Sequence, residues 1–481
     1  MAKTIYLPSP LGKLEAKYSA DGISSLGLLS KDNPMPLDDI ASLDAQGREI
    51  AGAIAGYFSG DKGALDTLKI DISGATPFQL TVYAALRKVA WGQALSYGDL
   101  ASAVGKPLAA RAIGAAVARN PLMFIIPCHR VLGADGKMHG FSAEGGLATK
   151  EWLLRHEGHA IENGKLVLAH ATPDEIIEAV PDYGGFHSGY AALVGRPNAG
   201  KSTLLNRLLG QPIAGVSAKP QTTRRRQLGI LTTDKAQIIF LDTPGFHDPI
   251  DKLSEFINAE AFYALADADI VAFLADSTAA PDSVDRKMIE LLQKKPRDHV
   301  LLVMTKQDLA DEKSRLTNEH SYQQLLPDVR TLRISAETGT GVDEFIAVLE
   351  ELLPEGPRYY PEEQVTEDFE RDIAAEMIRA SAMEKLEDEL PYSLAVKVLE
   401  FTERSNGDVY ILAAIFVERE AQKGILIGKS GQMIKEIGVS ARKAIEKMAD
   451  RKVFLSLDVK VQKDWKNNPF FLKEMGLAKQ K

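Results

Sequence analysis

The sequence is poor in residues that would cross-link the chain or hold it in a membrane. Its 481 residues include one cysteine, Cys128, which excludes an intrachain disulfide and favours a reducing compartment. No apolar run is long enough for a transmembrane helix, and the first eight residues do not resemble a signal peptide. We therefore expect a cytoplasmic protein.

The sequence also has no large excess of positive over negative residues, or the reverse. The chain has 57 Lys and Arg against 66 Asp and Glu, a net charge of −9. This excludes a protein that is basic all over, but it leaves room for nucleic-acid binding through local basic patches. The composition is that of an ordinary globular protein, and the length predicts about three or four domains.

One loop carries the plainest chemistry. Gly195–Ser202 has the pattern G-x-x-x-x-G-K-S; it follows the apolar run 190–194 and precedes a helical pattern over 203–209. In such a loop the backbone N–H groups and the helix N-terminus hold phosphates. Lys201 reaches the outer phosphates and Ser202 binds magnesium. The sequence therefore predicts a nucleotide site.

Later motifs identify the nucleotide. Asp242, at the end of an apolar run, is placed to hold the magnesium shell with Ser202 and Thr223, and Gly245 to meet the terminal phosphate. Further strands over 270–275 and 300–304 alternate with helices, which predicts a doubly wound sheet. Asp308 can accept two hydrogen bonds from guanine, so we expect GTP with Mg²⁺. The predicted site comprises Gly195, Asn198, Gly200, Lys201, Ser202, Thr203, Asp242, Gly245, Thr305, Lys306, Asp308, Ser335 and Ala336, with Thr222 and Thr223 in a switch loop.

The same motifs predict slow hydrolysis. Phe246 stands where Ras-like proteins carry the glutamine that orients water, and Thr305 replaces the commoner asparagine while still able to tie the base loop to the phosphate loop. In some related GTPases, the residue at Asn198 helps to hold a potassium ion. We expect stimulation by potassium or by a partner. The arginine run 224–226 is by itself more typical of a solvated surface.

The region before residue 170 has a different reactive centre. Short β-like runs and a helix over 43–58 indicate a scaffold, with no residue that demands chemistry. Two short helices, from Ser96 and over 108–118, suit a helix-turn-helix, although a plain helical hairpin gives the same pattern. Cys128 lies in Pro127-Cys128-His129-Arg130-Val131, where an imidazole can hold a thiolate, whereas an isolated cysteine is usually inert.

This region, with its later glycine loop, resembles the 6-O-alkylguanine-DNA alkyltransferases. The resemblance implies double-stranded DNA with an alkylated guanine flipped out of the helix, and one irreversible transfer to the cysteine. It also implies these roles: acceptor Cys128, base His129 acting through a water, orienting Glu157, proton donor Tyr97, loop brace Asn120, arginine finger Arg111, and Ser142 in the loop over guanine. Phe141 replaces a tyrosine of some relatives. The first ninety residues lack the Cys and His cluster of a zinc site, so no zinc is expected.

The C-terminal part predicts an RNA-binding domain. A helix over 366–386 precedes strands over 393–401 and 409–418, and a later helix ends near Met448 before a strand over 453–461. Gly428-Lys429-Ser430-Gly431 lies between an apolar run and that later helix, which fits the loop by which KH domains clamp single-stranded RNA. Local positive charge comes from Lys423, Lys429, Lys435, Arg442 and Lys443.

Residues from about 185 to the end resemble the Era family of ribosome-assembly GTPases. The motifs are Gly195–Ser202, Gln221-Thr222-Thr223-Arg224, Asp242–Gly245, Glu418–Lys423 and Gly428–Gly431. The resemblance implies binding to small-subunit ribosomal RNA and the small ribosomal subunit in the GTP state. Era-like proteins can also associate peripherally with the inner membrane, although no amphipathic anchor in this sequence demands it.

The sequence thus predicts a multidomain α/β and α+β protein with two activities. We expect an α+β domain over 1–74, a helix-turn-helix catalytic domain over 75–170, a linker over 171–187, a GTPase domain over 188–356 and an α+β KH domain over 357–481. Two alternatives remain at this stage. The N-terminal part could be a lesion sensor without catalysis, or the GTPase could act as a membrane or stress switch.

Overall fold

The computed structural model describes residues 2–477 except 108, 139, 163, 167–183, 218, 220–222, 225–226, 246–250 and 405. The chain forms two compact units. One contains Met1–Gly184 and Pro357–Pro361, and the other contains Gly185–Gly356 and Glu362–Lys481. Residues 171–183 of the predicted linker, together with Thr222 and Phe246, lie outside the described residues.

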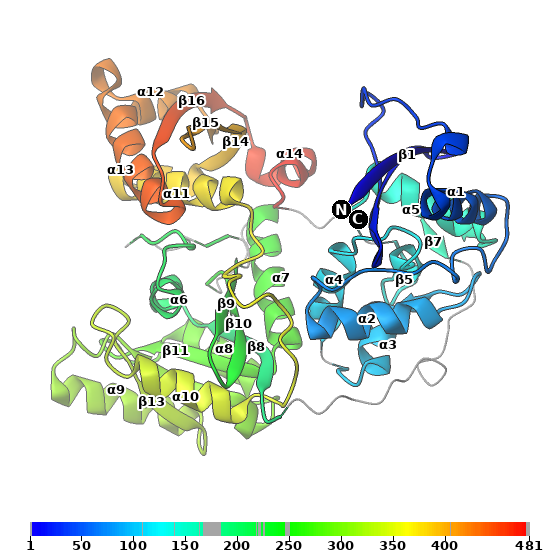
Figure 1. Ribbon diagram of the computed structural model, residues 1–481. Helices are drawn as coiled ribbons and strands as arrows, with labels where there is room; N and C mark the ends of the chain where they lie inside the picture. The colour runs from blue at the N-terminus through cyan, green and yellow to red at the C-terminus, as the bar shows by residue number, and fades with distance from the viewer. Residues whose placement is uncertain are drawn as a thin grey trace. The chain divides into compact units, whose positions relative to one another are not determined.

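The first unit begins with an antiparallel sheet of three strands. These are β1 (Lys3–Ser9), β2 (Gly12–Ser19) and β3 (Gly22–Leu28), in that order (Figure 1). Helix α1 (Ala45–Phe58) follows, and it begins two residues later than predicted because Asp44 accepts a hydrogen bond from the Gly47 N–H and caps it.

The second part of this unit is mainly helical. Its helices are α2 (Pro77–Lys88), α3 (Tyr97–Ala103), α4 (Ala110–Ala118) and α5 (Gly146–His156). Short strands β4 (Leu95–Ser96) and β5 (Val131–Leu132) pair in parallel, and β6 (Ile161–Glu162) pairs with β7 (Lys165–Leu166). The β4–β5 pair brings the start of α3 beside the turn that carries Cys128.

The second unit contains a six-stranded sheet in the order β13-β12-β11-β8-β10-β9 (Figure 1). The strands are β8 (His187–Val194), β9 (Gln227–Thr232), β10 (Ala236–Asp242), β11 (Ile270–Asp276), β12 (Val300–Thr305) and β13 (Arg330–Arg333). Only the β9–β10 pair is antiparallel among these pairings. The helices are α6 (Lys201–Leu209), α7 (Lys252–Asp267), α8 (Ser283–Leu292), α9 (Glu312–Leu325) and α10 (Val342–Leu352).

The unit ends with a three-stranded sheet and its helices. The elements are α11 (Glu370–Lys385), β14 (Ala395–Glu403), β15 (Val409–Val417), α12 (Glu420–Ile427), α13 (Gln432–Ala449), β16 (Val453–Val461) and α14 (Pro469–Glu474). A continuous buried core joins this part to the larger sheet, as shown by Leu205 of α6, Ile378 of α11 and Ile415 of β15. In the described part of the chain, no helix is both long and apolar enough to cross a membrane.

Candidate active sites

The thiol of Cys128 lies in a buried turn directly before β5. The residue is 5% exposed. Burial raises the pKa of Cys128, although the side chain of Asn120 and the positive charge of Lys150 oppose that shift. The thiol is therefore protonated at neutral pH, and it needs a base before it can act as a nucleophile.

A buried imidazole is available as that base. His129 Nε2–H donates to Glu157 Oε1 at 2.8 Å, and both side chains are fully buried. Burial lowers the pKa of His129 against the opposing effect of Glu157, so the ring is neutral at pH 7. Its Nδ1 is buried and has no partner among the described residues, which leaves a lone pair for a bridging water.

The carboxylate of Glu157 is held by the guanidinium of Arg130 as well as by His129. Arg130 Nε donates to Oε2 at 2.7 Å and Arg130 Nη2 to Oε1 at 2.8 Å. Burial alone would raise the pKa of Glu157, but His129 and Arg130 together hold it well below its usual range. Glu157 therefore stays ionised and fixes the tautomer of His129.

Of the other residues predicted for this centre, Asn120 and Ser142 line one cavity with Cys128, whereas Tyr97 and Arg111 are not in its lining. Asn120 Nδ2 donates to Ile126 O at 2.7 Å, so it braces the loop before Cys128. A cavity of about 450 Å³ is lined by both residues and by Ser142. Tyr97 begins α3, and Arg111 lies in the first turn of α4. Burial raises the pKa of Tyr97, and a thiolate at Cys128 would raise it further.

The structure adds a residue that the sequence did not indicate. Tyr57, at the end of α1, donates its O–H to Glu157 Oε1 at 2.9 Å and is 1% exposed. Helix α1, which the sequence indicates only as scaffold, therefore also supports the carboxylate of Glu157. One hundred residues separate the two side chains, and no local pattern marks such a contact.

In the second unit, the loop after β8 has the conformation that phosphate binding requires. Gly195 has φ 152°, and a Cβ there would lie 2.4 Å from Leu274 O. Asn198 and Gly200 also have positive φ, at 62° and 93°. Lys201 Nζ is buried and donates to Gly195 O at 3.1 Å and to Arg196 O.

This loop opens on a cavity of about 410 Å³. Its lining includes predicted site residues from four segments: Asn198, Gly200, Lys201, Ser202, Thr203, Thr223, Gly245 and Lys306. The carboxyl ends of the parallel strands meet at this edge of the sheet, which is where ligands bind in doubly wound folds.

Three oxygen-bearing side chains meet where Ser202 and Thr223 line the cavity. Asp242 Oδ2 accepts from Ser202 Oγ at 2.7 Å and from Thr223 Oγ1 at 3.3 Å. Asp242 Oδ1 is buried and has no partner in the described part of the chain. Burial raises the pKa of Asp242, opposed chiefly by Lys201. A hard divalent cation such as Mg²⁺ fits this set of oxygens.

The loop after β12 is tied to the phosphate loop. Thr305 Oγ1 donates to Ala199 O at 2.9 Å, and it also lies 3.2 Å from Ala275 O. Asp308 follows β12, while Ser335 and Ala336 follow β13. Because β12 and β13 are parallel neighbours, the two loops lie at the same edge of the sheet.

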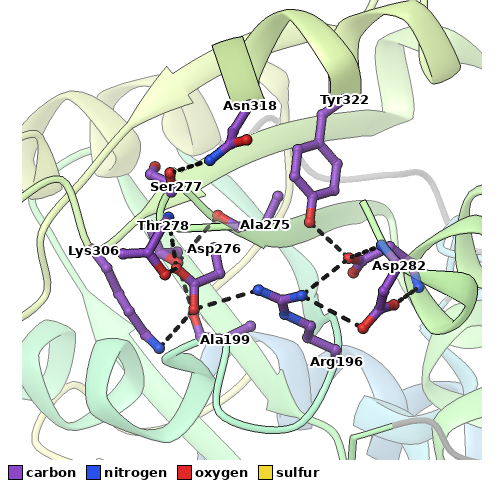
Figure 2. Close-up of polar contacts among 12 residues, drawn as sticks. Arg196, Ala199, Ala275, Asp276, Ser277, Thr278, Asp282, Lys306, Asn318 and Tyr322 are labelled. Atoms are coloured by element: carbon purple, nitrogen blue, oxygen red, sulfur yellow. Dashed lines mark hydrogen bonds and ion pairs between the residues drawn. The ribbon is translucent and has the colours of Figure 1, made fainter. Parts of the chain in front are cut away.

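Arg196 is a second residue that the sequence did not indicate. Its guanidinium lies 3.5 Å from Asp276 and Asp282 (Figure 2), and 3.6 Å from Asp285. Asp276 Oδ2 also pairs with Lys306 Nζ at 2.8 Å. The phosphate loop and the predicted base loop therefore share one carboxylate.

The C-terminal glycine loop joins α12 to α13. Gly428 and Gly431 have φ of 75° and 77°, and Ser430 has φ 53°. Lys429 and Ser430 are exposed at the tip. The basic side chains expected to bind RNA lie at the surface or half-buried around this loop and along α13: Lys423, Lys429, Lys435, Arg442 and Lys443.

Three regions of the chain each match a known protein family. Residues 77–159 match the 6-O-methylguanine DNA methyltransferase DNA-binding domain, residues 190–306 a 50S ribosome-binding GTPase, and residues 389–466 a KH domain. GTPase Era of Geotalea uraniireducens is 44% identical over 291 residues, which is 60% of this chain and 98% of that protein. GTPase Era of Geobacter metallireducens is likewise 44% identical over 292 residues, again 60% and 98%.

A solved structure supports the same assignment. The crystal structure of Era in complex with MgGDPNP and nucleotides 1506–1542 of 16S ribosomal RNA is 37% identical, with a TM-score of 0.58 over 61% of this chain and all of that one. These matches confirm the predicted fold class. The chain therefore belongs to the Era family of GTPases, and it carries an alkyltransferase DNA-binding domain before the Era region.

Proposed function

We propose that the first unit repairs 6-O-alkylguanine in double-stranded DNA by moving the alkyl group to Cys128. The observation that carries this proposal is a buried thiol beside an imidazole that a buried carboxylate orients. The cavity at Cys128 offers room for a base. Duplex DNA must present that base flipped out, with Arg111 filling the gap, because a pocketed thiol cannot reach into the base stack.

The chemistry balances without an added reactant. His129 Nδ1 takes the Cys128 proton through a water while Glu157 holds the opposite edge of the ring. Sγ then attacks the alkyl carbon, forming the S–C bond as the C–O6 bond breaks, and the electron pair stays with guanine. Tyr97 donates a proton to the departing base and then takes up a proton from solvent. His129 releases the proton that came from the thiol to solvent. The thioether is stable, so each molecule reacts once.

The pH profile tests this assignment of the base. The rate needs neutral His129, whose pKa lies below its ordinary value of 6.5. We therefore expect a single-turnover rate constant that is flat from about pH 8 to about pH 6.5 and falls only at lower pH. Rapid-quench assays with 6-O-methylguanine DNA would measure it. A rate that instead rises about tenfold per pH unit toward pH 9 would mean that Cys128 ionises without the base.

For the second unit we propose a GTP switch on small-subunit ribosomal RNA. The loop Gly428–Gly431 presents Lys429 and Ser430 to a single strand, and the solved Era relative holds 16S ribosomal RNA. Asp308 would select guanine. Magnesium, when bound, neutralises phosphate charge, and Ser202, Thr223 and Asp242 would hold it.

Ribosome binding separates this proposal from a membrane or stress switch. We would measure co-sedimentation with small ribosomal subunits and with vesicles of anionic lipid, in GTP and in GDP. Binding to subunits that needs GTP and is lost in Lys429→Ala supports the RNA switch. Binding to vesicles alone would favour the alternative.

Potassium dependence tests the role proposed for Asn198, which lines the phosphate cavity with φ 62°. If its side chain helps to hold a monovalent cation near the transferred phosphate, replacing sodium by potassium should raise GTP hydrolysis by at least about tenfold. Asn198→Ala should remove that difference and leave GDP affinity unchanged within about twofold. Equal rates of the wild-type protein in the two salts would remove potassium from the mechanism.

A further inference from the structure

The switch loop reaches into the C-terminal domain through Arg224. This residue directly follows Thr223, whose Oγ1 lies 3.0 Å from Ser202 Oγ at the magnesium site. Arg224 is 2% exposed. Its Nη2 donates to Tyr392 O at 3.1 Å and its Nη1 donates to Leu394 O. Adjacent residues thus contact the magnesium site and the KH domain.

Trp465 lies against the same guanidinium. The Arg224 Cζ is 5.5 Å from the centre of the indole, within the range of a cation–π contact. Trp465 is fully buried, and its Nε1–H donates to Ser393 O at 3.1 Å. Arg224 and Trp465 therefore bind three successive carbonyl groups, those of residues 392–394.

Trp465 also contacts the helix that follows the second phosphate-sensing segment. Leu253 and Ile257 of α7 pack in one buried cluster with Trp465, Phe471 and Leu472. Helix α7 is the next described helix after Asp242–Gly245. Phe471 and Leu472 belong to α14. Trp465 therefore packs against Arg224, which follows Thr223, and against α7, the next described helix after Asp242–Gly245.

We propose that Arg224 is a positioning residue that couples the nucleotide state to the KH domain through Trp465. A buried guanidinium is costly unless its donors are paired. The two Nη groups of Arg224 donate to Tyr392 O and Leu394 O, whereas its Nε has no partner among the described residues. Arg224 is therefore stable here only while these carbonyls and the indole stay in place. Holding the loop here presents Thr223 to magnesium and GTP. Because binding linkage is reciprocal, a KH domain that gives up this contact also weakens GTP binding. The RNA side of this coupling rests on the proposed function above.

The experiment compares two ratios in the full-length protein. The first is affinity for a non-hydrolysable GTP analogue with Mg²⁺ against affinity for GDP. The second is affinity for an RNA of 16S nucleotides 1506–1542 in those two nucleotide states. Arg224→Ala should lower each ratio at least about fivefold, with GDP affinity unchanged within about twofold. Arg224→Lys, which keeps the charge but not the planar fork, should fall between.

Two further variants make the result decisive. Arg330→Ala is the matched control, because this arginine on β13 is half-exposed and pairs with Glu351 at the surface; both ratios should stay at wild-type values. Trp465→Phe keeps the apolar packing but loses the Nε1–H, and its effect should not add to that of Arg224→Ala. Unchanged ratios in folded Arg224→Ala overturn the proposal. If Arg224→Ala does not fold, unchanged ratios in both Arg224→Lys and Trp465→Phe overturn the proposal. If the wild-type protein binds no RNA, the RNA function fails and the nucleotide ratio still decides the coupling.

Discussion

We expect Cys128→Ala to take up no label from DNA containing tritiated 6-O-methylguanine, whereas the wild-type chain takes up at most one methyl group per molecule. The reason is chemical: the variant has no nucleophile, although His129 and Glu157 remain in place at 2.8 Å. A small buried side chain is lost, so the stability change should be about 1 kcal/mol. Lesion binding by the cavity should therefore survive.

Because the chain has a single cysteine, the same experiment can also count the molecules that have not reacted. Cys128 is the one cysteine in 481 residues, so thiol titration after denaturation reports the unreacted fraction directly. Loss of thiol should equal gain of label. GTP hydrolysis should stay within about twofold, because Cys128 belongs to the first unit and the nucleotide cavity to the second. A wild-type protein that binds the lesion but keeps its thiol would be a lesion sensor, and label on Cys128→Ala would exclude this residue as acceptor.

The elements that position both centres could be predicted because their signals are local. The apolar runs at 270–275 and 300–304 are buried strands, each within one residue of the predicted ends. The loops that follow parallel strands must meet at one edge, so the motifs assemble once the strands do. The tie expected of Thr305 is present as its hydrogen bond to Ala199 O.

Contacts between residues far apart in the sequence, and a short helix, could not be predicted from the sequence. Tyr57 joins Glu157 only after two separate segments pack. Arg224 belongs to a basic run typical of a solvated surface, an interpretation that is wrong for this residue because carbonyls and an indole on another domain bury it. The apolar residues 425–427 form the end of helix α12. The start of this helix at Glu420 could not be predicted, because its local capping signal is less plain than that of α2. The roles of the site residues in solution stay predictions.

The second large effect concerns Lys201. We expect Lys201→Ala to lower GTP affinity and hydrolysis by about 10²–10³-fold, the loss typical when one preorganised cationic donor to a phosphate oxygen is removed. The nucleotide-free variant should nevertheless melt at the wild-type temperature or above. Equilibrium binding of a fluorescent GTP analogue and thermal unfolding with and without nucleotide would measure both.

The stability side of this prediction follows from the burial of the ammonium group. Lys201 is 6% exposed, and burial lowers its pKa despite the opposing charge of Asp242. A lowered lysine pKa means that folding disfavours the charged form, so the ion costs free energy at neutral pH and stability rises as pH approaches the unfolded pKa near 10.5. The acceptors at Gly195 and Arg196 offset part of that cost.

Phosphates would supply the missing negative charge, so GTP should raise the melting temperature of the wild-type protein and of the exposed-lysine control Lys313→Ala, but not of Lys201→Ala. Melting of nucleotide-free Lys201→Ala well below the wild-type temperature would instead assign Lys201 a structural role, because its two carbonyl contacts would then outweigh the cost of burying its charge.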